Sequence, residues 1–246
     1  MKLSLWRMFL LETQSYCNLR CPNCLRQTNP AKSRFRDGQP IREEMPTEKV
    51  HDLVDQASKL GYRGTVQFQY YSEPTCDPRL VSFVRYAKGK GMRTEIATNG
   101  TLLTDELCMQ LDGVADKIVI GIANRKPQRY WMARFRRTEV SVFLDRPEAW
   151  AVTHFSPQNE RLQAMIRKNI NTTCHIPRKY LIIQYDGEMS LCCDDLAHAW
   201  DLGNAFEKSL EELWWSEKHT EIIRTLSVPG GRLNYPYCRI CPAEDR

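Results

Sequence analysis

Short apolar segments alternate with helix-like segments through the first half of this 246-residue chain. Strands that alternate with helices form βαβ units, in which the strands run parallel. The sequence therefore predicts an α/β fold, either a partial (β/α) TIM-like barrel with parallel strands or a doubly wound sheet. The predicted strands are residues 8–12, 65–69, 94–98 and 117–122, and apolar residues at helical spacing between them predict helices at 46–60, 77–87 and 104–111.

The character of the chain changes between residues 155 and 173. Beyond this boundary, a predicted strand at 180–185 is followed by Asp186-Gly187, a two-residue hairpin signal, and by a return strand at 188–192. A further helix is expected from Ser209 onward. We therefore divide the chain into a partial barrel, residues 1–160, and a small C-terminal domain of a β-hairpin and helices, residues 161–246.

Ten cysteines are many for a chain without a recognisable secretion signal. Residues 1–7 lack the long apolar stretch of a signal peptide. No apolar run approaches the roughly 20 residues that span a bilayer. We therefore expect a cytoplasmic protein with no membrane partner. In a reducing compartment, clustered cysteines indicate metal binding or catalysis rather than disulfide bonds.

Three cysteines, Cys17, Cys21 and Cys24, lie directly after the first predicted strand. Iron–sulfur clusters require thiolate ligands, because soft sulfur matches iron. Three thiolates on a four-iron cluster leave one iron open to another ligand. A zinc site is the other interpretation, but three cysteines in a strand–loop context fit zinc less well.

The C-x3-C-x2-C spacing at this position resembles the signature of the radical S-adenosylmethionine (radical SAM) superfamily. In that family the open iron binds S-adenosyl-L-methionine, and reductive cleavage gives a 5′-deoxyadenosyl radical that abstracts a hydrogen atom from the substrate. The resemblance implies a radical SAM enzyme with a [4Fe–4S] cluster at these three cysteines. It also implies an external electron donor such as flavodoxin or ferredoxin.

The resemblance extends to segments that contact S-adenosylmethionine in the family. Residues 71–74 match the family's Gly-Gly-Glu-Pro motif at its last two positions, and Glu73 is assigned to the cofactor's ammonium group. Residues 98–100 match its Thr-Asn-Gly. Asn23 departs from the aromatic residue usual before the third cysteine, and the Ser-x-Asp that often ends the fourth strand is absent. The implied cofactor-binding residues are Ser72, Glu73, Pro74, Thr98, Asn99 and Asn124.

A second group of cysteines, Cys174, Cys192, Cys238 and Cys241, lies towards the C-terminus. Two separated cysteines and a C-x2-C pair also fit a structural zinc ribbon. Their arrangement around the predicted hairpin resembles the SPASM and twitch modules appended to many radical SAM enzymes. That resemblance implies one auxiliary [4Fe–4S] cluster, and two [4Fe–4S] clusters in all, because a full SPASM module needs more cysteines than remain.

The size and cysteine layout most resemble the twitch-domain dehydrogenases of aminocyclitol antibiotic biosynthesis. This resemblance implies hydrogen abstraction from a polar substrate, with two-electron oxidation of an alcohol as the leading outcome. Residues 125–137 hold six basic side chains and no acid, which extends the candidates to acidic substrates. Arg129 and Arg134 are candidate substrate contacts.

Other outcomes stay open. An epimerase would need a thiol that returns a hydrogen atom, and Cys76 or Cys193 could supply it. A peptide-modifying enzyme is compatible with a SPASM-type module, and modification of a nucleotide or nucleic acid would explain the basic segment. The alternative of a different class is a zinc-bearing nucleic-acid-binding module, whose binding would depend strongly on salt.

Overall fold

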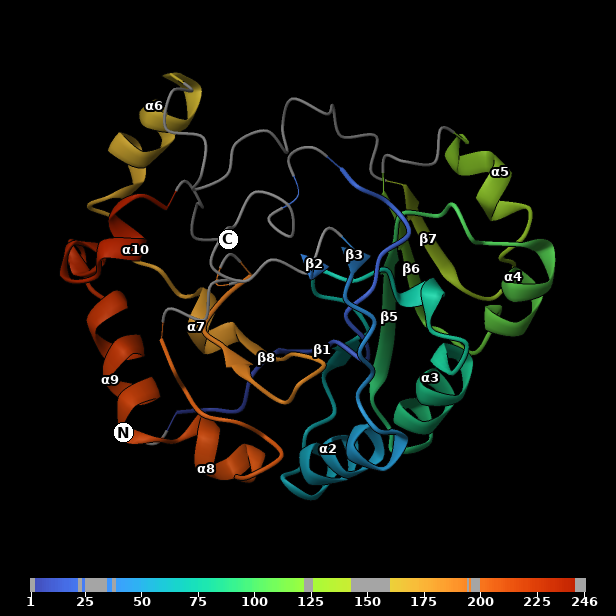
Figure 1. The fold of residues 1–246 in the computed structure, drawn as a ribbon, viewed down its shortest axis with the longest axis horizontal. Coiled ribbons are helices and arrows are strands. Elements are labelled where there is room, and N and C mark those ends of the chain that lie inside the picture. The colour runs from blue at the N-terminus through green and yellow to red at the C-terminus, as the bar shows by residue number, and fades with distance from the viewer. Residues whose placement is uncertain are drawn as a thin grey trace.

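Seven strands form one sheet in the order β7-β6-β5-β4-β1-β8-β9 (Figure 1). The computed structural model describes residues 3–21, 24, 35–36, 39–121, 126–142, 160–193, 195 and 200–241. The strands of this sheet are β1 (Met8–Leu11), β4 (Thr65–Gln67), β5 (Arg93–Thr98), β6 (Lys117–Ile120), β7 (Glu139–Val142), β8 (Tyr180–Ile183) and β9 (Met189–Ser190).

All neighbouring strands of this sheet run parallel except β8 and β9, which form an antiparallel hairpin. Because β7 and β9 are edge strands, the sheet is open rather than closed into a full barrel. The predicted α/β fold with a partial, parallel-stranded barrel is confirmed. The connections between the parallel strands contain α2 (Thr47–Lys59), η1 (Pro74–Cys76), α3 (Leu80–Gly89), α4 (Asp105–Leu111) and α5 (Gln128–Met132).

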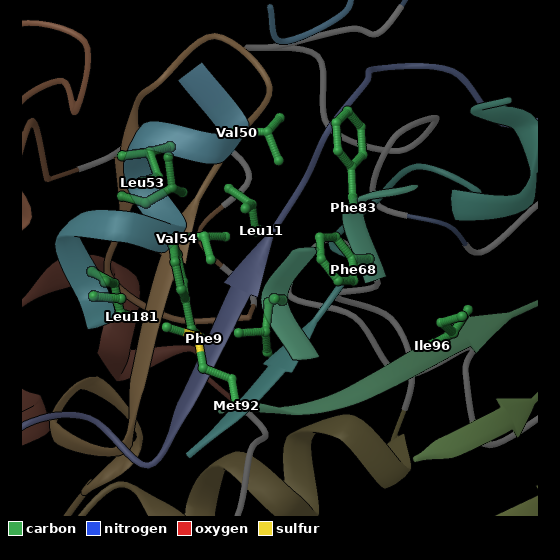
Figure 2. Close-up of a cluster of buried hydrophobic side chains, with 14 of the residues drawn as sticks. Phe9, Leu11, Val50, Leu53, Val54, Phe68, Phe83, Met92, Ile96 and Leu181 are labelled. Carbon is green, nitrogen blue, oxygen red and sulfur yellow. The ribbon is translucent and has the colours of Figure 1, made fainter. Parts of the chain in front are cut away.

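The main hydrophobic core lies between one face of the sheet and the helices. Phe9 and Leu11 of β1 are both fully buried and lie on the same face, because alternate residues of a strand share a face. Helix α2 presents Val50, Leu53 and Val54 to them, and Figure 2 shows these side chains meeting. The apolar spacing that predicted this helix therefore also identified its buried face.

The opposite face of the sheet carries polar residues on β4 to β7, whereas Leu10 of β1 and Ile182 of β8 on the same face are buried and apolar. One cross-strand row, fixed by the register, contains Gln67, Glu95, Lys117 and Glu139. The Gln67 amide donates to Glu95 Oε1 at 2.5 Å, and Lys117 Nζ lies 3.1 Å from Glu139 Oε1. Burial raises the pKa of Glu95, although the nearby Lys117 opposes that shift. This part of the face is therefore suited to polar rather than apolar contacts.

The C-terminal part of the chain joins the same sheet through β8, which pairs parallel with β1. Gly187 turns the hairpin with φ +85°, and Asn204 and Phe206 lie so close that a Cβ at this position would collide with them. Around the hairpin lie α6 (Glu160–Asn169), α7 (Ile176–Lys179), α8 (Leu210–Trp214), α9 (Glu217–Leu226), η3 (Gly231–Asn234) and α10 (Pro236–Arg239). The division into domains at residue 160 stays a prediction.

Two local features differ from the expectation. The helix expected from Ser209 is two helices, because Ser209 caps α8 in a capping box and Ser216 caps a second helix, α9. The polar segment before α2 contains a short antiparallel pair, β2 (Phe35–Arg36) and β3 (Gln39–Pro40). No helix in the described ranges is long and apolar enough to cross a membrane.

The core contact of α2 generates a stability prediction. Replacing the fully buried Leu53 with alanine should lower the free energy of unfolding by about 2–5 kcal/mol, because a cavity would remain beneath β1. The matched control is Met109→Ala on α4, a side chain that is 69% exposed, which should change it by less than about 0.5 kcal/mol. Anaerobic denaturant titration followed by circular dichroism measures both, and equal effects would contradict this assignment of the core.

Candidate functional site

The first three cysteines lie on the loop that leaves the carboxyl end of β1. Cys17 and Cys24 are half-buried, whereas Cys21 is exposed. The backbone NH of Cys24 donates to the carbonyl of Cys21 at 3.0 Å, and the NH of Leu19 points to Cys17 Sγ at 3.5 Å. The loop thus returns on itself and presents its thiols at the carboxyl edge of the sheet, where open α/β sheets bind ligands.

Glu73 is a buried carboxylate at the N-cap of η1, on the turn that follows β4. Its Oε1 accepts from the backbone NH of Thr75 at 3.1 Å and from the Thr98 hydroxyl at 2.5 Å. Its Oε2 accepts from the backbone NH of Asn99 at 2.7 Å. These donors fix the carboxylate between the ends of β4 and β5.

Asn99 links the end of β5 to the cysteine loop. Its amide donates to Asn18 Oδ1 at 3.0 Å, and Asn18 in turn donates to the Thr101 hydroxyl at 2.8 Å. Thr101 closes the ring by donating to Asn99 Oδ1. The Asn99 amide also lies 4.0 Å from Cys17 Sγ. The Thr-Asn-Gly segment and the first cysteine, identified separately in the sequence, are therefore neighbours.

Backbone contacts bind the cysteine loop to the Glu73 turn as well. The NH of Glu73 donates to the Tyr16 carbonyl at 2.9 Å, and the Gln14 amide donates to the Glu73 carbonyl at 2.8 Å. Ser72 and Pro74, on either side of Glu73, are buried. Residues 14–17 and 72–75 thus form one hydrogen-bonded unit.

Cys76 ends η1 and is partly buried. Desolvation raises the pKa of its thiol to about 11, and the charges of Glu73 and Cys17 act in the same direction. The group is therefore a neutral thiol near neutral pH, close to the Glu73 turn.

The second group of cysteines surrounds a single pocket. Cys174, Cys192, Cys238 and Cys241 all line it, although they come from three separate segments of the chain. Apolar side chains such as Leu191 and Leu226 complete much of the wall. Desolvation raises the pKa of Cys238 to about 12, and the nearby Cys174 adds to the rise. A ligand that replaces the thiol protons would relieve this penalty.

Two tyrosines, which the sequence analysis passed over, connect the Glu73 turn to the second cysteine group. The Tyr70 hydroxyl donates to the Cys192 carbonyl at 3.1 Å, and the Tyr71 hydroxyl donates to the Cys193 carbonyl at 2.5 Å. Their rings meet edge to face with centroids 4.5 Å apart. The aromatic pair next to Ser72-Glu73 was visible in the sequence, but nothing local indicated a partner 122 residues away.

The predicted arginines lie on or next to helix α5. Arg129 is exposed. Arg134 pairs through Nε with Asp105 Oδ1 of α4 at 2.7 Å and stacks on the Tyr130 ring at 3.7 Å. These partners belong to the helical layer, so the structure does not bring Arg134 to Glu73. Asn124, like Asn23 and Arg125, lies outside the described residues.

The donor sets fit iron–sulfur clusters. Each consists of cysteine thiols alone, the ligands that such clusters use. Across the described ranges, no three His, Cys, Asp or Glu side chains converge as ligands of a single metal ion. The four thiols of the second group instead stand around a pocket, as four corners of a polynuclear cluster require.

Two family models match this chain. Residues 11–146 match the radical SAM superfamily, and residues 174–242 match SPASM, an iron–sulfur cluster-binding domain. The first match covers more than half of the chain, so the protein belongs to the radical SAM superfamily. It is therefore an enzyme that uses S-adenosylmethionine and a [4Fe–4S] cluster, and its second cysteine group lies in an iron–sulfur domain.

Individual relatives match the whole chain or part of it. The S-adenosyl-L-methionine-dependent 2-deoxy-scyllo-inosamine dehydrogenase of Niallia circulans is 26% identical over 96% of this chain and 93% of its own. A cofactor-modifying protein of tungsten-containing aldehyde ferredoxin oxidoreductase from Pyrococcus furiosus is 36% identical, but over 41% of this chain and 26% of its own.

Solved structures show the same fold. The structure of BtrN with AdoMet and 2-DOIA superposes with a TM-score of 0.73 at 21% identity, over 97% of this chain and 93% of that one. The structure of anSMEcpe with AdoMet gives a TM-score of 0.60 at 13% identity, over 96% and 88%.

The exposures and pKa values predict an order of thiol reactivity in the cluster-free protein. Cys21 and Cys193, which are exposed, should react with iodoacetamide first at mildly alkaline pH, because the thiolate is the reactive form. Cys238, Cys76 and Cys108 should react last, since burial raises the pKa of each. Timed alkylation with peptide mass spectrometry measures the order, and early labelling of Cys238 would contradict it.

Proposed function

We propose that this enzyme oxidises a secondary alcohol of a polar, amino-bearing cyclic substrate to a carbonyl group. The carrying observation is that the two cysteine groups are joined through the Glu73 turn, by Tyr70 and Tyr71. A substrate above the carboxyl edge of the sheet could then be reached from both sides. The similarity to an inosamine dehydrogenase over 96% of the chain supports the alcohol as the reacting group.

In this proposal Cys17, Cys21 and Cys24 ligate the first cluster, and bound S-adenosylmethionine supplies the hydrogen-abstracting radical. Glu73 Oε2 accepts one hydrogen bond from Asn99, which leaves it able to accept another from the cofactor's ammonium. Thr98 and Asn99 fix the orientation of the Glu73 carboxylate for this contact. Ser72 and Pro74 fix the turn, and Asn124 is assigned to the ribose by resemblance.

Cys174, Cys192, Cys238 and Cys241 would ligate one auxiliary [4Fe–4S] cluster, so that the chain holds two clusters. The apolar side chains in the wall of their pocket lower the polarity around the thiols. When bound, this cluster supplies a one-electron acceptor or a substrate anchor. An external flavodoxin or ferredoxin would supply electrons to the first site. Such thiol chemistry fits the reducing cytoplasm.

The similarity to an inosamine dehydrogenase over 96% of the chain also supports an amino-bearing substrate. Arg129 remains a candidate for an acidic substituent, because its exposed guanidinium is not committed to the helical layer as that of Arg134 is.

Epimerisation is the second candidate. Cys193 is exposed beside the Tyr71 contact, and Cys76 has a raised pKa that keeps its hydrogen atom in place. Either thiol could return a hydrogen atom to a substrate radical. A product that keeps the alcohol but has the inverted configuration would identify epimerisation. The inversion should then be lost in Cys193→Ala or Cys76→Ala.

The cluster assignment predicts iron contents. Anaerobically reconstituted protein should hold about eight irons per chain, and Cys238→Ala about four, because one cluster loses a ligand. The matched control is Cys108→Ala, a buried helical cysteine outside both groups, which should keep about eight. Iron and sulfide assays measure these contents. About four irons per chain in the unsubstituted protein would contradict the proposed auxiliary cluster.

The reaction predicts the fate of the carbinol hydrogen. Reduced enzyme given S-adenosylmethionine and an amino-cyclitol deuterated at that carbon should release deuterated 5′-deoxyadenosine and a ketone in equal amounts. Cys21→Ala should release neither, because the first cluster would lose a ligand. Mass spectrometry follows both products. Unlabelled 5′-deoxyadenosine without ketone would contradict this substrate class.

A further inference from the structure

Arg232 is a buried cation in the wall of the four-cysteine pocket. Its side chain is 1% exposed, and it lies on η3 beside Cys174, Cys192 and Cys238. The other described residues that line this pocket are cysteines and uncharged side chains. An arginine stays protonated at any pH a protein tolerates, so the pocket contains a permanent positive charge.

The chain holds Arg232 in place by several local contacts. Its guanidinium donates through NH2 to the Thr173 carbonyl at 3.3 Å, next to Cys174. Gly231, the residue before it, lies against the Thr225 carbonyl at a distance that leaves no room for a Cβ. The η3 turn therefore packs directly against the end of α9. This contact fixes the backbone position from which the Arg232 side chain extends.

A buried residue of opposite charge, Asp195, is hydrogen-bonded to two residues of the pocket wall, Leu191 and Cys192. Asp195 is fully buried, and its NH donates to the carbonyl of Cys192 at 3.1 Å. Its carboxylate accepts from the backbone NH of Leu191 at 3.0 Å, which fixes the side chain behind the pocket wall. The charges of Arg232 and Asp195 act in opposite directions on the Cys238 thiol. Both groups therefore lie close enough to affect a charge inside the pocket.

A four-thiolate iron–sulfur cluster is anionic and gains a further negative charge when it accepts an electron. A buried cation stabilises the reduced form more than the oxidised form, and a buried anion does the reverse. Arg232 and Asp195 are themselves almost completely buried, so solvent screens their charges weakly.

We infer that Arg232 and Asp195 set the reduction potential of the auxiliary cluster, Arg232 raising it and Asp195 lowering it. Arg232 tunes the reduction potential through its charge and is not a ligand of the cluster. The inference rests on the proposed function, in that Cys174, Cys192, Cys238 and Cys241 must hold the cluster. In that role a higher potential makes the site a better electron acceptor.

The test isolates the auxiliary cluster in the full chain by replacing Cys17, Cys21 and Cys24 with alanine. Potentiometric titration, read by electron paramagnetic resonance of the reduced cluster, then gives its potential without any turnover. Arg232→Gln in this background should move the potential to a more negative value. A tenfold loss of the reduced form at fixed applied potential corresponds to about 59 mV. Arg232→Lys, which keeps the charge but not the planar guanidinium, should stay close to the parent.

The outcomes distinguish failure of the charge-tuning inference from failure of the proposed auxiliary cluster. About four irons in the parent background with a potential that neither variant moves would overturn the inference but keep the cluster. Equal shifts in Arg232→Gln and Arg232→Lys would overturn it too, because packing would then be responsible. No iron in the parent background would overturn the proposed auxiliary site itself. If Arg232→Gln fails to retain iron, Asp195→Asn decides, since an upward shift supports the inference and an unchanged or lower potential overturns it.

Discussion

The hydrogen bonds accepted by the Glu73 carboxylate are the interaction on which the site depends. They join the turn after β4 to the end of β5, through Thr98 and Asn99. Asn99 then reaches the cysteine loop after β1 through Asn18. Three strand ends that are far apart in the sequence are thus fixed by one buried charge. Because both oxygens of that carboxylate accept hydrogen bonds, its burial is tolerated, and removing these donors would leave it uncompensated.

The parallel pairing of β8 with β1 has an equally direct consequence for function. It adds the C-terminal hairpin to the edge of the sheet next to the strand that leads into Cys17. Cys192 follows the return strand of that hairpin, so this pairing brings the second cysteine group towards the first. Tyr70 and Tyr71 then fix the hairpin end to the Glu73 turn. The two sites therefore depend on one continuous sheet.

Much of this arrangement could be predicted from the sequence, because its signals are local. Apolar spacing located α2 and its buried face, and Asp186-Gly187 located the hairpin. Cysteine spacing and short motifs identified both candidate sites. Local patterns could not show that β8 pairs with β1, since a hairpin signal fixes the partner strand within the hairpin but not the sheet edge that receives it. The five-residue helix α5 was missed because so short a segment has little periodicity.

Arg232 illustrates a different limit of sequence reasoning. It stands in a segment rich in glycine and proline, a composition typical of exposed turns, where an arginine is expected in solvent. Its burial follows from the close approach of Gly231 to the end of α9, a tertiary contact. The two cysteine groups differ in the same respect. Cys21 is exposed on a loop, as a site that must admit a cofactor and electrons requires, whereas the four-cysteine pocket has an apolar wall with one permanent charge. At the exposed Cys21 thiol solvent screens charge, which suits a position that must be accessible. In the four-cysteine pocket the buried charge of Arg232 is weakly screened, so the side chains around the thiols become as important as the thiols themselves.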